Sequence, residues 1–518
     1  MNQRKGAMTR VVLLGSENGA PPLPLTGLPG SPMAFQRLID QAAAYDPEPV
    51  MIVRPGQAAF YPGARTVESA DRAGDLRAIA EVAAGLDEDL LVLPADSLIH
   101  DELIYQLVKS KRGAVALVVR EERDPDAPEP PPIEEAVPEI GMNILEGRPQ
   151  RARISKTRVI SQGSAYHQVT RPNAALLGPL HLKASQVANL AEAAGDVAEF
   201  ASLTGPEDGV TELLVLGLVR RGVSVGIRGR RDLFYRQVNA GNADEAVREF
   251  LTFDEDRARL DNAVKGADGF FTTYFVSTYS RFIARWAARR GLTPNQVTLI
   301  SIALGLLAAG AFATGGRPGY VAGGVLIYFA FVFDCVDGQV ARYARKFGVL
   351  GAWLDATFDR FKEYAVFVGL AVGATVSGQF GDGEEIWTLA LIALALQSVK
   401  HLLDFSFGAA NRRKPPNPLP TLDLAVADDR PLRDALEVRK ATSGGAVKNL
   451  LRLWTKAGKF RTVHWARKMI VFPIGERFAA IAVVTAFFDP RVTFLVLITW
   501  GGIAATYTLT GRLLRSMA

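Results

Sequence analysis

Six long apolar runs in the second half of the chain constrain its fold more than any other feature. A helix needs about 20 mostly apolar residues to cross the hydrocarbon core of a bilayer. Runs of this kind predict membrane spans at residues 297–314, 319–341, 351–376, 386–405, 470–488 and 492–511. We therefore expect residues 293–518 to form an all-α polytopic membrane domain with six transmembrane helices.

The basic residues between these spans predict their orientation. Only Arg317 lies between the first and second spans, only Arg491 between the fifth and sixth, and none between the third and fourth. The opposite side holds 14 Lys and Arg residues in the stretch 411–468, together with Arg342, Arg345 and Lys346. Because loops rich in Lys and Arg stay in the cytoplasm, both termini are predicted to be cytoplasmic, in a protein of the cell membrane.

Residues 266–292, just before the first span, predict an amphipathic helix. Arg281, Arg285 and Arg289 follow one another at intervals of four, with aromatic residues between them. Such a helix suits the headgroup layer of a membrane. An ordinary soluble amphipathic helix has the same periodicity, but the position before a span favours the interface.

Residues 1–265 predict a cytoplasmic α/β domain of the Rossmann-like kind. The strand-like segments "RVVLLG", "PVMIVRP", "DLLVLPAD" and "GAVALVVRE" alternate with helix-like segments, which favours a mostly parallel sheet. The single cysteine, Cys335, excludes an intramolecular disulfide. Basic residues concentrate near the apolar runs, so we expect an anionic membrane or phosphorylated substrates as partners, and no nucleic acid.

Four aspartates stand among the apolar runs, in "FDCVDGQVARYARKFGVLGAWLDATFDRFKEY". On a helix, Asp334 and Asp337 share one face, and Asp355 and Asp359 share another. The link between the two helices is short, so the two faces can meet. A carboxylate at membrane depth is costly and usually marks a functional site, and a cluster of carboxylates favours Mg²⁺, Mn²⁺ or Ca²⁺.

Three residues close to the aspartates in sequence indicate which kind of ligand the site binds. Gly338 and Gly351 leave room for a bulky ligand beside the carboxylates, and Arg342 carries a guanidinium that can grip a phosphate. Together these features predict phosphoryl transfer assisted by two metal ions. A charge network that only holds the helices together is one alternative, and a cation channel or proton-coupled transporter is another. Consumption of a substrate by detergent-purified protein, where no gradient exists, would distinguish an enzyme from a transporter.

This stretch resembles the signature of the CDP-alcohol phosphotransferases, D-x-x-D-G-x-x-A-R, eight residues, then G-x-x-x-D-x-x-x-D. The resemblance extends from about residue 270 to the C-terminus. The signature is matched at Asp334, Asp337, Gly338, Ala341, Arg342, Gly351, Asp355 and Asp359.

The resemblance implies a reaction and roles for these residues. A CDP-linked donor would be cleaved, CMP released and the other phosphoryl group passed to an alcohol. Two Mg²⁺ or Mn²⁺ ions would be held by the four aspartates, and Asp359 would also take the proton of the acceptor hydroxyl. A homodimer is implied as well. The nucleotide would be bound by Pro294, Asn295, Thr298, Asp337, Gly338, Ala341, Arg342 and Gly351.

The donor and the acceptor are predicted less directly. We favour CDP-diacylglycerol as the donor and a polar alcohol such as inositol phosphate as the acceptor, in phospholipid synthesis. A soluble CDP-alcohol donor is the alternative. Family members that accept inositol phosphate have basic residues in places comparable to Lys400 and Arg477, although either residue could instead anchor its helix at the membrane interface.

The first 265 residues resemble sugar-nucleotidyltransferases at "LLVLPADSLIHDELI" and "RPNAALLGPLHL". Those enzymes open with a glycine-rich loop that carries basic residues, whereas the stretch from Gly15 to Phe35 contains Glu17 and no Lys or Arg. Asp96 could bind a metal or cap the following helix. We therefore expect a nucleotidyltransferase-like fold that has lost the reaction, while a bifunctional cytidylyltransferase and CDP-inositol-type phosphotransferase is the alternative.

Overall fold

The chain folds into two compact units in the computed structural model. The first comprises Met1–Glu255 and Pro416–Thr442, and the second comprises Asp256–Pro415 and Ser443–Ala518. The expected division had its boundary at residue 265 and kept residues 416–442 with the membrane domain. The structure describes residues 8–15, 21–25, 33–120, 141–143, 148–155, 157–230, 232–265, 268–378, 384–412, 419–423, 425–442, 454, 458 and 460–517.

A nine-stranded sheet in the order β3-β2-β1-β4-β11-β6-β12-β10-β9 forms the centre of the first unit. Strands β1 to β4 pair in parallel, and so do β6 and β12, whereas β11 runs antiparallel to both β4 and β6. The α/β class is thus as predicted. The prediction of a mostly parallel sheet holds only for part of it, since β10 also runs antiparallel to β12 and β9. The strands are β1 Thr9–Leu14, β2 Val50–Val53, β3 Arg65–Glu68, β4 Asp89–Pro94, β6 Ala114–Arg120, β9 Ala152–Ser155, β10 Arg158–Gln162, β11 Ala174–Leu182 and β12 Val225–Gly229.

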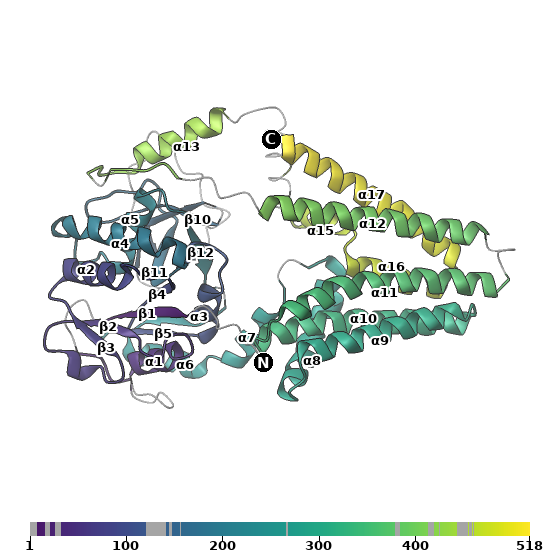
Figure 1. Ribbon diagram of the computed structural model, residues 1–518, viewed down its shortest axis with the longest axis horizontal. Helices are drawn as coiled ribbons and strands as arrows, with labels where there is room; N and C mark the ends of the chain where they lie inside the picture. Colours follow the sequence, from purple (N-terminus) through teal and green to yellow (C-terminus); the bar gives the residue numbers. More distant parts are fainter. Residues whose placement is uncertain are drawn as a thin grey trace. The chain divides into compact units, whose positions relative to one another are not determined.

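Helices cover both faces of this sheet (Figure 1). On one face, α2 (Arg72–Ala83), α4 (Ala184–Glu199) and α5 (Val210–Arg220) pack together over a core of buried aliphatic side chains. A second, smaller core joins α1 (Ala34–Ala42) and α6 (Ala243–Thr252) around Phe234 and Phe250. The strand β5 (Ser97–Ile99) directly follows β4 in the chain and pairs antiparallel with β13 (Tyr235–Gln237) in the same unit.

The segment that follows α12 in sequence completes the first unit. Leu419 and Leu432 are buried in the main core of the sheet, and Arg220 of α5 donates hydrogen bonds to the carbonyls of Asp423 and Val426. Arg220 also donates to Nδ1 of His167 at 2.5 Å. Burial, together with the positive charge of Arg220, lowers the pKa of His167 to about 4, so the ring is neutral and can accept this bond. A fragment ending at residue 265 would therefore lack part of its own core.

The second unit is helical throughout its described residues (Figure 1). Four of its helices are long and apolar enough to cross a membrane, and α15 with α16, bent by 71° at a short break, could form a fifth span. The helix α11 does not pass this test of composition, because charged residues crowd its first half. The length and composition of the described helices therefore support four or five spans, and the predicted six are not confirmed. The helices are α7 Glu255–Ala263, α8 Ser277–Arg289, α9 Pro294–Ala313, α10 Arg317–Tyr343, α11 Val349–Val376, α12 Glu384–Arg412, α15 Arg461–Ile470, α16 Ile474–Phe487 and α17 Pro490–Met517.

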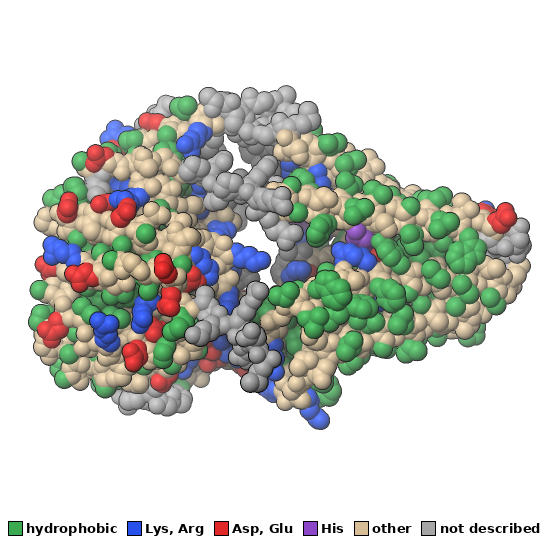
Figure 2. Space-filling view, in the orientation of Figure 1, with side chains coloured by type: hydrophobic (Ala, Val, Ile, Leu, Met, Phe, Trp, Pro, Cys, Tyr) green, Lys and Arg blue, Asp and Glu red, His purple; other side chains and the backbone are tan. Residues whose placement is uncertain are grey.

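The surfaces of the two units differ in composition (Figure 2). Charged side chains of both signs are spread over the visible face of the first unit, whereas hydrophobic side chains cover most of the helical unit. Exposed side chains on the helices include Leu299, Leu307, Val325, Leu391 and Ile503. Large exposed apolar surfaces of this extent are costly in water, and a lipid environment removes that cost.

The arginines of α8 have protein partners. Arg281 pairs with Asp261 of α7 at 2.6 Å, and Arg285 and Arg289 pair with Asp256 at 3.5 and 3.1 Å. The sequence pattern predicted an amphipathic helix in the headgroup layer of a membrane, and it did not predict these ion pairs with α7. The aromatic residues of this region remain available to a membrane surface: exposed are Tyr274, Phe275, Phe282 and Trp286.

Candidate active site

Helix α9 packs against both α10 and α11, and these three helices position the candidate site. Helix α9 begins at a capping box, in which Thr293 and Gln296 satisfy each other's backbone amides and Pro294 occupies the first turn. Helices α10 and α11 are joined by a connection of only a few residues. The aspartates near the end of α10 therefore face those near the start of α11, as their spacing predicted.

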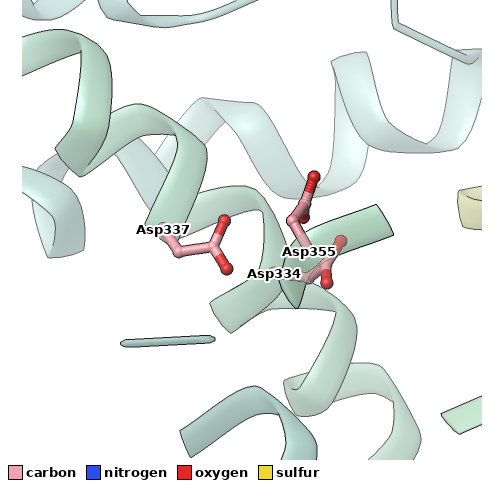
Figure 3. Close-up of side chains that lie close together, drawn as sticks. All are labelled: Asp334, Asp337 and Asp355. Carbon is pink, nitrogen blue, oxygen red and sulfur yellow. The ribbon is translucent and has the colours of Figure 1, made fainter. Parts of the chain in front are cut away.

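Three of the four aspartates converge on one point. Asp334, Asp337 and Asp355 each offer one carboxylate oxygen, and these oxygens lie within 4.8 Å of one another. Figure 3 shows the carboxylate of Asp337 turned toward those of Asp334 and Asp355. Within the part of the chain that the structure describes, no other group of three His, Cys, Asp or Glu residues meets this criterion. An all-oxygen donor set of this size fits a hard divalent cation such as Mg²⁺ or Mn²⁺.

The fourth aspartate, Asp359, is not a member of this group. Its Oδ1 atom lies 3.1 Å from Nζ of Lys362, one turn further along α11. The same ammonium contacts Oδ1 of Asp334 at 2.5 Å. Asp359 is thus joined to the cluster through a lysine.

The residues expected to bind the nucleotide surround the three carboxylates. Thr298 donates its hydroxyl to Oδ2 of Asp337 at 2.6 Å, and so it orients this carboxylate. A side chain at Gly351 would lie 2.7 Å from Oδ1 of Asn295, so the amide of Asn295 occupies the space beside this glycine. Near Gly338 lies the guanidinium of Arg342, whose Nε donates to the carbonyl of Ala263. Ala341 lies on the same part of α10 and is partly exposed.

Lys400 and Arg477, the expected acceptor-binding residues, both contact the break between α15 and α16. Lys400 donates to the carbonyls of Val471 and Phe472 at 2.6 and 3.2 Å, and Arg477 donates to Phe472 at 2.8 Å. A broken helix leaves carbonyls without their usual partners, and these two cations supply new ones.

Arg477 also forms a buried ion pair that the sequence pattern did not predict. Its Nε lies 2.7 Å from Oε1 of Glu363, and its NH2 lies 3.2 Å from Oε2. His401 approaches the same carboxylate at 3.5 Å. Glu363 is fully buried. The only sequence signal for Lys362 and Glu363 was the presence of two charged residues well inside a span.

In the first unit, Asp96 follows β4 and is bound by an amide. Both of its carboxylate oxygens accept from Nε2 of Gln237, at 3.1 and 2.9 Å. A cavity of about 330 Å³ lies beside Asp96, and its lining includes Pro22, Phe35 and Tyr61 and no Lys or Arg among the described residues. Much of the loop between Gly15 and Phe35, on which the predicted loss of activity rests, lies outside the described residues.

Comparison with known proteins identifies the part of the chain that carries the aspartates. Residues 291–421 match the family model described as CDP-alcohol phosphatidyltransferase. These residues are therefore similar to members of that family. The resemblance seen in the signature is thus confirmed for this region, and the long apolar helices with this family domain make the chain an integral membrane protein.

Two curated proteins are similar to parts of the chain. A phosphatidylinositol phosphate synthase of Mycobacterium tuberculosis is 40% identical over 88 residues, which are 17% of this chain and 40% of that protein. A "Bifunctional IPC transferase and DIPP synthase" of Rubrobacter xylanophilus is 41% identical over 83 residues, 16% of this chain and 18% of that protein. The chain therefore matches less than half the length of each of these relatives.

A solved structure is similar at the level of the fold. It is an inositol-1-phosphate CTP transferase from T. maritima, with 13% sequence identity, a TM-score of 0.32, and coverage of 48% of this chain and 98% of that chain.

Proposed function

We propose that the protein is a membrane phosphotransferase that cleaves a CDP-linked donor, releases CMP and transfers the remaining phosphoryl-linked group to a polar alcohol. The observation that carries this proposal is the convergence of Asp334, Asp337 and Asp355 on one point, in helices of a family whose members are CDP-alcohol phosphatidyltransferases. A charge network that merely held the helices together would need only ion pairs such as Lys362–Asp334, and not three carboxylates that converge on one point.

The residues of the site would have different roles in the proposed reaction. The three carboxylates would hold a divalent ion, which would neutralise the diphosphate of the donor as negative charge moves onto the departing CMP. Thr298 fixes the orientation of Asp337, and the guanidinium of Arg342 lies where a phosphate could approach over Gly338. Asp359 would accept the proton of the acceptor hydroxyl. The oxygen of that hydroxyl would then bond to the phosphorus distal to cytidine, and the P–O bond to CMP would break.

We assign CDP-diacylglycerol as the donor and inositol phosphate as the acceptor. The relative from Mycobacterium tuberculosis is named as a phosphatidylinositol phosphate synthase, and a membrane-embedded site suits a lipid donor. Lys400 and Arg477 remain our candidates for the acceptor phosphate, although each already has a partner within the chain. A homodimer is proposed from the family resemblance, and light scattering in detergent would test it.

The test of this function is CMP release by the full-length protein in detergent. Radiolabelled CDP-diacylglycerol and CDP-inositol are each supplied with Mg²⁺ and a panel of alcohols. We expect CMP and a lipid phosphate product from CDP-diacylglycerol with inositol phosphate. Absence of turnover with every donor would refute the proposal and would favour an ion-transporting role for the carboxylates.

We further propose six spans, with both termini and the aspartates on the cytoplasmic side. Helices α9, α10, α12 and α17, the bent α15–α16 pair and the charge-rich α11 would supply these spans. In a variant without Cys335, a cysteine at Ser377 should react with an impermeant thiol reagent outside intact cells, and a cysteine at Arg439 should react only after lysis. The reverse pattern of labelling would overturn this orientation.

For the nucleotidyltransferase-like unit we propose a fold without the nucleotidyl transfer reaction, serving to stabilise, regulate or recruit. Asp96 is engaged by the amide of Gln237, and it belongs to no group of three potential metal ligands among the described residues. A triphosphate bound in the adjacent cavity would meet no Lys or Arg from its described lining. The second candidate function is a bifunctional enzyme, which is favoured by the name of the relative from Rubrobacter xylanophilus.

A pyrophosphate assay decides between the two candidates. Full-length protein with CTP, Mg²⁺ and a panel of sugar and inositol phosphates should release no pyrophosphate above background. The full chain is required because residues 416–442 complete the core of this unit. Steady release that is lost in Asp96→Ala would show that the protein makes its own CDP-linked donor.

A further inference from the structure

Lys362 is a cation built into the candidate active site. Its side chain is 1% exposed, and it lies on α11 one turn beyond Asp359. The ammonium contacts Oδ1 of Asp334 at 2.5 Å, Oγ of Ser301 at 2.8 Å and Oδ1 of Asp359 at 3.1 Å. Hydrogen bonds to Asp334 and Ser301 use two of the three donors of the ammonium, and Asp359 is held beside it as an ion pair.

Helix α9 is shaped to receive this side chain. Ser301 donates its own hydroxyl proton to the carbonyl of Ala330 at 2.8 Å, so its lone pairs are left to accept from Lys362. One turn further along α9, a side chain at Gly305 would lie only 2.8 Å from Cγ of Lys362 and 3.1 Å from its Cδ. The serine and the glycine thus provide an acceptor for the ammonium and space for its stem.

The position of the ammonium is one that a second metal ion would otherwise require. Asp334 contributes to the three-carboxylate group and also contacts Lys362, while Asp359 contacts Lys362 and lies outside that group. Two carboxylates this close repel each other unless a positive charge lies between them. One divalent ion and one ammonium together neutralise three of the four carboxylate charges.

We propose that Lys362 takes the place of a second metal ion, bridging Asp334 and Asp359, so that the site holds a single divalent ion between Asp334, Asp337 and Asp355. This inference rests on the proposed function, and it replaces the two ions expected from the family resemblance with one ion and one fixed cation. Lys362 is then a positioning residue, which holds Asp359 in place without depending on the concentration of free metal.

Counting bound ions tests the inference independently of turnover. Purified full-length protein in detergent is titrated with Mn²⁺, and bound ions are counted by electron paramagnetic resonance. We expect one Mn²⁺ per wild-type chain and one per Lys362→Arg chain, which retains the cation. Lys362→Met should bind a second Mn²⁺ between the two released carboxylates. Two ions in the wild type, or no second ion in folded Lys362→Met, would overturn the inference.

A second variant, and a comparison of the ion count with CMP release, cover the cases in which Lys362→Met does not fold or the protein is inactive. If Lys362→Met does not fold, the number of Mn²⁺ ions bound to the wild-type protein still tests the inference. A second variant, Gly305→Ala, displaces the stem of the lysine side chain and should therefore raise the occupancy of a second Mn²⁺. An unchanged count in folded Gly305→Ala would then speak against the inference. A protein that binds one Mn²⁺ but releases CMP from no donor would refute the proposed function alone, whereas an active protein with two bound ions would refute the role of Lys362 alone.

Discussion

Asp359→Asn is expected to lower the rate of CMP release by roughly 10²–10⁴-fold, the usual contribution of a general base. The substitution keeps the size of the side chain but removes its ability to take a proton. Donor binding should persist, because Asp359 lies outside the group formed by Asp334, Asp337 and Asp355. The two measurements are the rate of CMP formation and the binding of radiolabelled CDP-diacylglycerol in the presence of Mg²⁺.

The matched control is the same substitution at Asp355. Asp355→Asn removes one of the three converging carboxylates, so it should lose donor binding as well as turnover. This contrast separates a proton-accepting role from a metal-binding role, since both variants replace a carboxylate with an amide on the same helix. Near-normal turnover by Asp359→Asn would show that another group accepts the proton.

Arg477→Met is expected to destabilise the protein by about 3–5 kcal/mol, the typical cost of removing one member of a buried ion pair. The substitution would leave Glu363, which is fully buried, without the guanidinium that contacts both of its carboxylate oxygens. It would also remove a donor from the carbonyl of Phe472 at the helix break. The measurement is the free energy of unfolding in detergent, from a titration with SDS.

A double variant provides the control for this effect. Because an apolar pair of similar volume can replace a buried ion pair with little loss, Glu363→Leu combined with Arg477→Met should be more stable than Arg477→Met alone. A role in acceptor binding predicts a different result: a raised KM for inositol phosphate with unchanged stability. That outcome would show that Arg477 binds the acceptor, and Lys400 would then be the residue that donates to the carbonyls at the helix break.

Several features of the protein could be predicted from local sequence patterns. The spacing of Asp334 and Asp337, and of Asp355 and Asp359, places each pair on one helix face, because the period of an α-helix is a local property. The lengths of the apolar runs located the long helices for the same reason. The alternation of strand-like and helix-like segments indicated an α/β unit, although the antiparallel β11 in the middle of the sheet was not predicted.

The sequence by itself determined that carboxylates would meet between two of the long helices, because helical periodicity and a short connection leave few other arrangements. Only the tertiary structure decided how those charges are balanced. Whether Lys362 reaches Asp334 depends on Ser301 and Gly305 of α9, which are far from it in sequence. Likewise, two carbonyl partners of Arg220 lie about two hundred residues away, in the segment 416–442. These contacts between residues far apart in sequence form because particular helices and strands pack together. A local sequence pattern does not predict that packing.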